Sequence, residues 1–212
     1  MARTRAATYD AQRQLILETA AQAFAELGFP SASMNDIARR SGMSKGLLYH
    51  YYASKEQLLF AVAEQYTRRL VELVREVEGR VADPVQRLPE LIRAFLDEYQ
   101  TSQARHMVLL HDLRFLPEAE RRTVVGNQRR VIEAFVAAVR AAHRLPDDFP
   151  VVKPVTMMLF GMMNWTFAWL KPGKGISYAQ YAALVTEVFA AGVAALAGKR
   201  APRVAAVPAA TL

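Results

Sequence analysis

The chain has 212 residues, of which 52% are apolar and 22% charged, a composition typical of a globular protein rather than a disordered one. It contains no cysteine, which excludes disulfides and thiolate zinc sites. Its formal net charge of +7 favours polyanionic partners, although net charge alone says nothing about the fold.

Neither a secretory signal nor a membrane span is predicted. Arg3 and Arg5 precede an apolar stretch that Glu18 and Glu26 interrupt, so a signal peptide would lack its apolar core, and we expect a cytoplasmic protein. Residues 155–170 include no ionisable side chain, but a spanning helix needs about 20 apolar residues. We interpret this stretch as a buried helix and expect no membrane partner.

Apolar residues recur at intervals of three and four along most of the chain, which predicts an all-α fold. The first helix ends at Gly28, since glycine is the usual residue just past a helix end. Ser33, Ser44 and Ser54 are predicted to cap the second, third and fourth helices. Further helices are expected from about Pro84, then over 103–115, 118–142, 152–170 and 177–197, which makes about nine in all.

The second and third helices carry the pattern of a helix-turn-helix. Residues 37–44 read I-A-R-R-S-G-M-S, with a small Ala38 where two helices touch and Gly42 at a tight turn. The second helix of such a unit enters the major groove of DNA, although a plain helical hairpin has the same pattern. Residues 37–55 include four basic residues and no acid, which favours DNA binding because phosphates require positive charge.

Particular side chains are expected to face the nucleic acid. Lys45 and Gly46 begin the third helix, so the Lys45 amine and the Gly46 amide would point at a phosphate or a base edge. Lys55, at the start of the fourth helix, is expected to bind a phosphate. Arg3 and Arg5 lie in a predicted flexible arm, residues 1–10, which either reaches a minor groove or stays free.

Residues 11–66 resemble the DNA-binding domain of the TetR family of repressors, most specifically in the stretch S-K-G-L-L-Y-H-Y-Y-A-S-K-E-Q-L. The resemblance implies a homodimer that binds a palindromic double-stranded DNA operator and releases it on binding a small-molecule effector. It implies that residues 11–54 read DNA and residues 55–198 bind the effector and dimerise. The tail, 199–212, alternates Ala, Pro, Arg and Val without periodicity, so we expect it to be disordered. Seven residues occupy positions that contact DNA in the family: Ser44, Lys45, Gly46, Tyr49, His50, Tyr51 and Lys55. Of these, Tyr51 best suits a structural role. Ser33 is a further expected DNA-binding residue.

Small residues in the last helix suit the close helix approach that dimerisation needs in this family. These residues are Ala190, Ala191, Gly192, Ala194 and Ala195. An intramolecular core would use them equally well.

The segment 104–144 holds eight arginines against four acids. One interpretation is an anionic effector whose phosphates meet guanidinium groups and whose apolar part is buried by the Met- and Trp-rich helix. The other is a solvated basic face above an ordinary core. The stretches D-L-R-F-L-P and L-F-G-M-M-N-W-T-F-A-W-L resemble the acyl-CoA-sensing branch of the family, in particular the branch that responds to phenylacetyl-CoA in phenylacetate catabolism. The candidate effector-binding residues are His106, His111, Arg114, Phe115, Met158, Met162, Asn164, Trp165 and Trp169.

We expect neither a metal site nor an enzyme. His106 and His111 are five residues apart and therefore do not share a helix face as a metal-binding pair would. The sequence lacks the G-x-S-x-G, H-E-x-x-H and complete phosphate-loop patterns. No cofactor is expected besides the effector. Two alternatives stay open, a repressor that senses another apolar effector such as a drug and an enzyme that acts on acyl-CoA.

Overall fold

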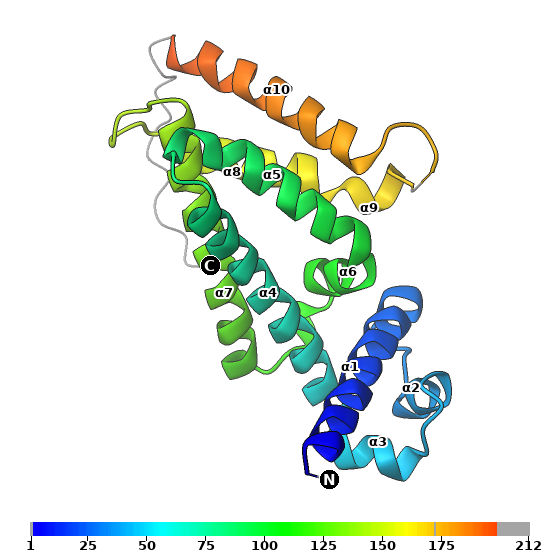
Figure 1. The fold of residues 1–212 in the computed structure, drawn as a ribbon. Coiled ribbons are helices and arrows are strands. Elements are labelled where there is room, and N and C mark those ends of the chain that lie inside the picture. Colours follow the sequence, from blue (N-terminus) through cyan, green and yellow to red (C-terminus); the bar gives the residue numbers. More distant parts are fainter. Residues whose placement is uncertain (1, 172, 199–212) are drawn as a thin grey trace. The chain divides into compact units, whose positions relative to one another are not determined.

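The computed structural model describes residues 2–171 and 173–198, with only the backbone for residues 2–8. These residues form ten α-helices and one 3-10 helix, η1, and none of them lies in a strand (Figure 1), which confirms the all-α prediction. The count is nine if α8 and α9 are taken as the single helix expected from the sequence. The predicted disordered tail lies outside the described residues.

The chain divides into two compact units. The first comprises the residues up to Leu70 together with Ser102–Gln128, and the second comprises Val71–Thr101 together with the residues from Arg129 onward. The first unit therefore includes much more than the segment 11–54 that was expected to read DNA.

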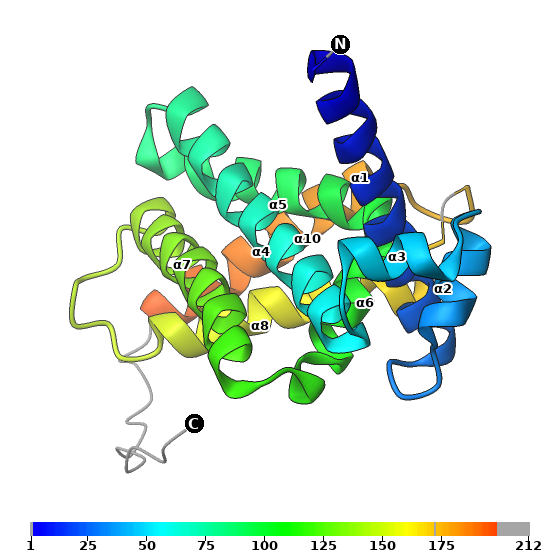
Figure 2. The ribbon, with the colours of Figure 1, turned by 90° about the horizontal axis from the view of Figure 1, so that it is seen from below.

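The first unit is built on α1 (Ala2–Leu27), against which α2 (Met34–Arg40) and α6 (Gln103–His111) pack. Figure 2 shows α2 and α3 (Lys45–Tyr51) beside α1. The unit also includes the start of α4 (Lys55–Arg80), η1 (Leu113–Phe115) and the start of α7 (Glu118–Ala142). Apolar side chains from α1 to α4 that are almost fully buried form its core: Ile16, Leu17, Ala20, Phe24, Ile37, Leu48, Leu58 and Leu59.

The helix α1 begins at Ala2, so residues 2–10 continue the helix where the sequence suggested a flexible arm. Three alanines and two arginines, both strong helix formers, lie in this segment. The side chains of Arg3 and Arg5 lie outside the described residues.

The second unit combines α5 (Pro84–Thr101), α8 (Val152–Asn164), α9 (Thr166–Trp169) and α10 (Tyr178–Ala197) with parts of α4 and α7. Its core contains the Phe135 ring, whose centroid lies 4.9 Å from that of Phe95 and 4.8 Å from that of Phe160. The buried Tyr99 hydroxyl donates a hydrogen bond to Asn164 Oδ1 at 3.1 Å, and burial raises the pKa of this tyrosine.

Two expected helices are each interrupted. The segment 103–115 divides at Asp112 into α6 and η1, and the segment 152–170 divides at Trp165 into α8 and α9. Thr166 Oγ1 donates to the Met163 carbonyl at 2.9 Å, and such side-chain bonds compete with regular helical pairing.

The segment 155–170 is half-exposed rather than a buried helix. Leu159 and Met163 are fully buried, but Met158 and Trp165 are 68% and 62% exposed. Periodicity identifies an apolar face without saying what covers it, and here the apolar residues lie on two faces.

The helix α10 is the one helix of the described residues that is long and apolar enough to cross a membrane. The core helix of a protein without any membrane span passes the same test. Only 22% of its apolar stretch is buried within the chain, so this helix, too, exposes an apolar face.

Candidate nucleic-acid interface

Local side-chain contacts build the turn between α2 and α3. Ser33 Oγ accepts a hydrogen bond from the Asp36 backbone N–H at 3.1 Å, and Ser44 Oγ accepts one from the Leu47 N–H at 3.2 Å. Each serine caps its helix, as predicted. Gly42 has φ +67°, a backbone conformation that glycine adopts without strain. The pair therefore has helix-turn-helix geometry.

One face of α3 is held in the core and the other is presented to solvent. Leu48 is fully buried, whereas the DNA-facing candidates of α3 and its cap are exposed: Ser44, Lys45, Gly46, Tyr49 and His50. A Cβ added to Gly46 would meet no atom within 4 Å, so the fold itself does not require glycine there. Close approach of a binding partner to the backbone at residue 46 would explain the glycine. Lys45 Nζ lies 5.8 Å from the centroid of the Tyr49 ring.

The end of α3 is tied to α1. The Tyr51 hydroxyl donates to Gln12 Oε1 at 2.6 Å, and its ring stacks on Tyr9 at 4.8 Å. Arg13 Nε donates to the Tyr52 hydroxyl at 3.2 Å. The structure thus gives Tyr51 an intramolecular role. The sequence argument did not identify Gln12 and Arg13, because 39 residues separate each from its partner and no local pattern joins them.

Lys55 is directed into the protein, contrary to the expectation that it binds a phosphate. Its ammonium donates to the carbonyls of Phe29, Pro30 and Ala32 at 2.7, 3.2 and 3.0 Å. It also lies 4.5 Å from the centroid of the Phe29 ring. Since its donors are used by these three carbonyls, the structure gives Lys55 a structural role.

Residues 37–55 include no acid, but acidic side chains from outside this stretch lie beside its arginines in the fold. Arg39 pairs with Asp36 at 3.1 Å and Arg40 with Glu26 at 2.6 Å. The Ser33 hydroxyl, followed by Arg39 and Arg40, lowers the pKa of Asp36. The positive charge of the helix-turn-helix therefore rests mainly on Lys45 of α3, with a contribution from the exposed side chain of Arg39 of α2.

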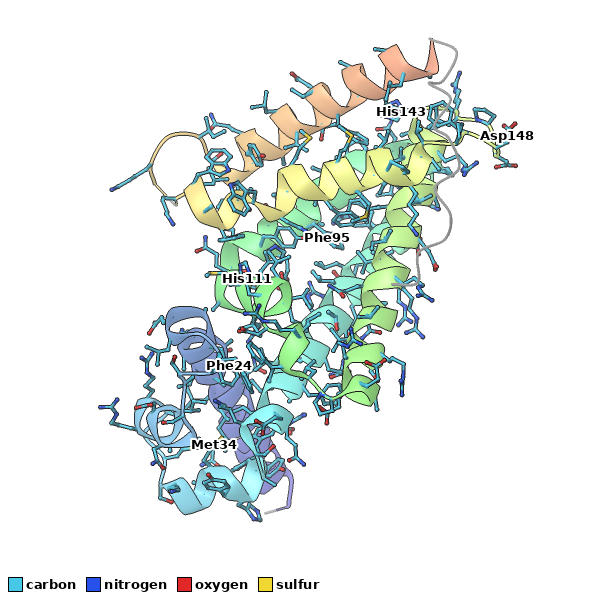
Figure 3. The ribbon with its side chains drawn as sticks, turned by 180° about the vertical axis from the view of Figure 1, so that it is seen from behind. Phe24, Met34, Phe95, His111, His143 and Asp148 are labelled. Carbon is cyan, nitrogen blue, oxygen red and sulfur yellow. The ribbon has the colours of Figure 1, made fainter. Side chains whose placement is uncertain are left out.

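The candidate effector residues fall into both units. In the first unit, His106 is buried, and its Nδ1 lies 3.2 Å from the Tyr66 hydroxyl. His111, the last residue of α6 (Figure 3), and Arg114 are exposed. Phe115 is half-buried, with its ring 5.1 Å from that of Phe29. In the second unit, Met162 and Asn164 are half-buried, whereas Met158, Trp165 and Trp169 are exposed. Among the described residues, no group of acidic or histidine side chains is arranged to hold a metal ion.

Comparison with known proteins assigns both parts of the chain. The family model of bacterial regulatory proteins of the tetR family matches residues 16–62, and that of tetracyclin repressor-like C-terminal domains matches residues 81–193. A curated relative, the HTH-type transcriptional activator FasR of Mycolicibacterium smegmatis, is 31% identical over 120 residues. That match covers 56% of this chain and 55% of FasR, so the chain spans about half the length of this relative.

Two solved structures are similar over nearly their whole length. A TetR-family transcriptional regulator from Bordetella parapertussis is 34% identical, with a TM-score of 0.77 over 84% of this chain and 93% of that one. AibR in complex with isovaleryl coenzyme A and operator DNA is 27% identical, with a TM-score of 0.74 over 84% of this chain and 98% of that one.

Tyr51→Phe should lower the free energy of unfolding by about 1 kcal/mol, because the half-buried Gln12 carbonyl oxygen loses its donor. Urea denaturation at fixed protein concentration measures the change. Tyr49→Phe is the matched control, since it removes the same hydroxyl from an exposed ring of the same helix. Equal stabilities of the two variants would contradict the anchoring role of Tyr51.

Proposed function

We propose that this chain, which belongs to the TetR family of bacterial regulatory proteins, represses transcription in the cytoplasm as a homodimer on a palindromic operator. An acyl-CoA thioester such as phenylacetyl-CoA releases it. The family assignment makes the chain a transcriptional regulator rather than an enzyme.

The presentation of α3 carries the DNA-binding part of the proposal. A capped helix exposes Lys45, Gly46 and Tyr49 while Leu48 and Tyr51 hold its other side. In helix-turn-helix proteins, the N-terminal side chains of the second helix reach base edges. The similar AibR structure contains operator DNA, which supports the same use of this helix.

Lys45→Met should weaken operator binding and reduce its salt dependence. Each lost phosphate contact lowers the slope of log K against log salt by about 0.9, so the loss from two subunits amounts to about 1.8. The measurement is fluorescence anisotropy, over a salt series, on a duplex that the wild-type protein selects from a random library. Lys174→Met, which removes the same charge from an exposed turn, should leave the slope unchanged. An unchanged slope for Lys45→Met would exclude Lys45 as a phosphate contact.

Exposed apolar side chains of the second unit support dimerisation through α8, α9 and α10. Met158, Trp165, Trp169, Leu184 and Val188 are between 47% and 68% exposed. Large exposed apolar side chains on helices that pack together, as α8 does with α9 and α10, suit an interaction surface. The adjacent Ala191 and Gly192 on α10 are exposed and small, which permits close approach of a second helix. A second copy of the chain is the partner that we propose for this face.

Val188→Glu should raise the dissociation constant of the dimer by at least about a hundredfold, because a two-fold interface would bury two unpaired carboxylates. Sedimentation velocity across a concentration series measures it. Val125→Glu places the same charge at an exposed valine of α7 and should leave the dimer intact. The proposal fails if wild-type protein is monomeric or if Val188→Glu dimerises normally.

The effector is inferred from chemistry and similarity together. The AibR neighbour was solved with isovaleryl coenzyme A, which supports a CoA thioester here. Asn164 Oδ1 already accepts from Tyr99, so the amide N–H groups of Asn164 suit the thioester carbonyl of a ligand. Exposed arginines of the same unit, such as Arg129, suit its phosphates.

At least one CoA thioester should release the labelled operator, with a fall in DNA affinity of about a hundredfold. Such a fall needs only about 2.7 kcal/mol of differential affinity between two states of the protein. The titration compares phenylacetyl-CoA, isovaleryl-CoA, a long-chain acyl-CoA and free CoA. Release by none of the thioesters would remove the effector proposal, and release by a cationic drug alone would favour the drug-sensing alternative.

A further inference from the structure

Leu47 is an apolar side chain of α3 that the fold leaves partly uncovered. It is 37% exposed, whereas the next residue, Leu48, is fully buried. The Leu47 backbone N–H already donates to Ser44 Oγ at 3.2 Å, so its side chain is the part of this residue that a partner can use. A single exposed leucine is common on protein surfaces, and the role of Leu47 therefore has to be argued from its surroundings.

The neighbours of Leu47 on α3 are the side chains proposed to face DNA. Leu47 lies three residues before the exposed His50, so the two share one side of the helix. Gly46, which precedes Leu47, has open space where a Cβ would lie. A leucine side chain is short and touches a base only if the backbone comes close to the floor of the groove. Gly46 permits that approach, because it places no side chain in the way.

The composition of α3 leaves little for reading bases through hydrogen bonds. In the major groove, Arg and Lys pair with guanine, Asn and Gln with adenine, and Asp and Glu with cytosine. The helix reads K-G-L-L-Y-H-Y, and Lys45 is its one residue of these types. The apolar group that a base pair presents in the major groove is the C5-methyl group of thymine. Thymine is therefore the base whose chemistry matches Leu47.

The contacts that hold α3 also fix where Leu47 lies. Leu48 is buried in the core, and Ser44 caps the start of the helix. At the other end, the Tyr51 hydroxyl donates to Gln12 of α1. Dispersion contacts between carbon atoms weaken strongly over about an ångström, so an apolar side chain selects a base only when it is held in place. The attachment of α3 at both ends provides this placement.

We propose that Leu47 selects thymine at one position of each operator half-site, through contact of its side chain with the C5-methyl group of that base. The inference rests on the DNA-binding function proposed above and deepens it, because it names a chemical feature of the operator that α3 recognises. Leu47 is thus a specificity-determining residue. The sequence argument did not include it among the DNA-facing candidates, because an apolar residue in a short helix is expected to lie in the core.

Replacement of thymine by deoxyuridine tests the contact, because it removes the C5-methyl group and keeps the charge and hydrogen-bonding groups of the base. The duplex is one that the wild-type protein selects from a random library, and each thymine is replaced in turn, in both half-sites together. Burial of one methyl group is worth about fourfold in affinity, so loss of two should weaken binding about fifteenfold. Fluorescence anisotropy should show this loss at one symmetric pair of thymines.

Leu47→Ala connects the methyl group to this side chain. The variant should bind the thymine duplex about as weakly as the wild type binds the deoxyuridine duplex, and the deoxyuridine replacement should cost it no further affinity. Leu47→Met keeps an apolar side chain of similar reach and should retain most of the wild-type response. Leu110→Ala is the matched control, since it shortens a leucine of α6 that is 38% exposed and should keep the full fifteenfold response, as expected of about two lost methyl contacts.

Two results would overturn the inference. One is a wild-type protein whose affinity no deoxyuridine replacement changes, and this result needs no variant to fold. The other is a Leu47→Ala protein that remains as sensitive to the replacement as the wild type, which would assign the methyl contact to another side chain. Should Leu47→Ala fail to fold, Leu47→Gln, which has a polar end and a similar length, takes its place with the same expected result. Failure of the wild type to select any duplex would instead overturn the proposed function.

Discussion

The attachment of α3 to the rest of the first unit is the constraint on which DNA reading depends. A helix of seven residues is not stable alone in water, because too few hydrogen bonds repay the cost of nucleation. Burial of Leu48, the Ser44 cap and the Tyr51–Gln12 bond supply the missing stability. All three act on one side or one end of the helix. The opposite side is left for side chains that the fold does not need.

Those features that depend on near neighbours could be predicted from the sequence. Ser33, Ser44 and Ser54 each cap a helix three residues before the amide they accept from, and Gly42 takes the positive φ that the turn needs. The all-α class followed from periodicity. The position of Lys55 could not be predicted, because its partner Phe29 is 26 residues away in the sequence. Similarly, a window free of acids does not reveal that Glu26 folds back onto Arg40.

The second unit shows a different limit of sequence patterns. The lack of ionisable side chains predicted a buried helix over 155–170, yet it cannot distinguish burial within one chain from burial between two chains. Leu159 and Met163 are buried within the unit, whereas Met158 and Trp165 are mostly exposed. On α10, Val185 and Phe189 are buried while Leu184 and Val188 are exposed. Both helices thus have more apolar surface than their own unit covers. The sequence reveals that these helices are strongly apolar, but it does not reveal which side chains stay exposed in one chain.

If the chain acts as the dimer proposed above, the distribution of charge makes dimerisation and DNA binding interdependent. The net charge of +7 is spread over the chain, and the basic residues beside α3 are partly neutralised by Asp36 and Glu26. Few phosphate contacts are therefore available to one copy, and a protein with few such contacts binds DNA weakly at physiological salt. Two copies joined through α8 and α10 would make the second half-site contact intramolecular, which raises its effective concentration. Operator affinity would then depend on the spacing of the two copies of α3.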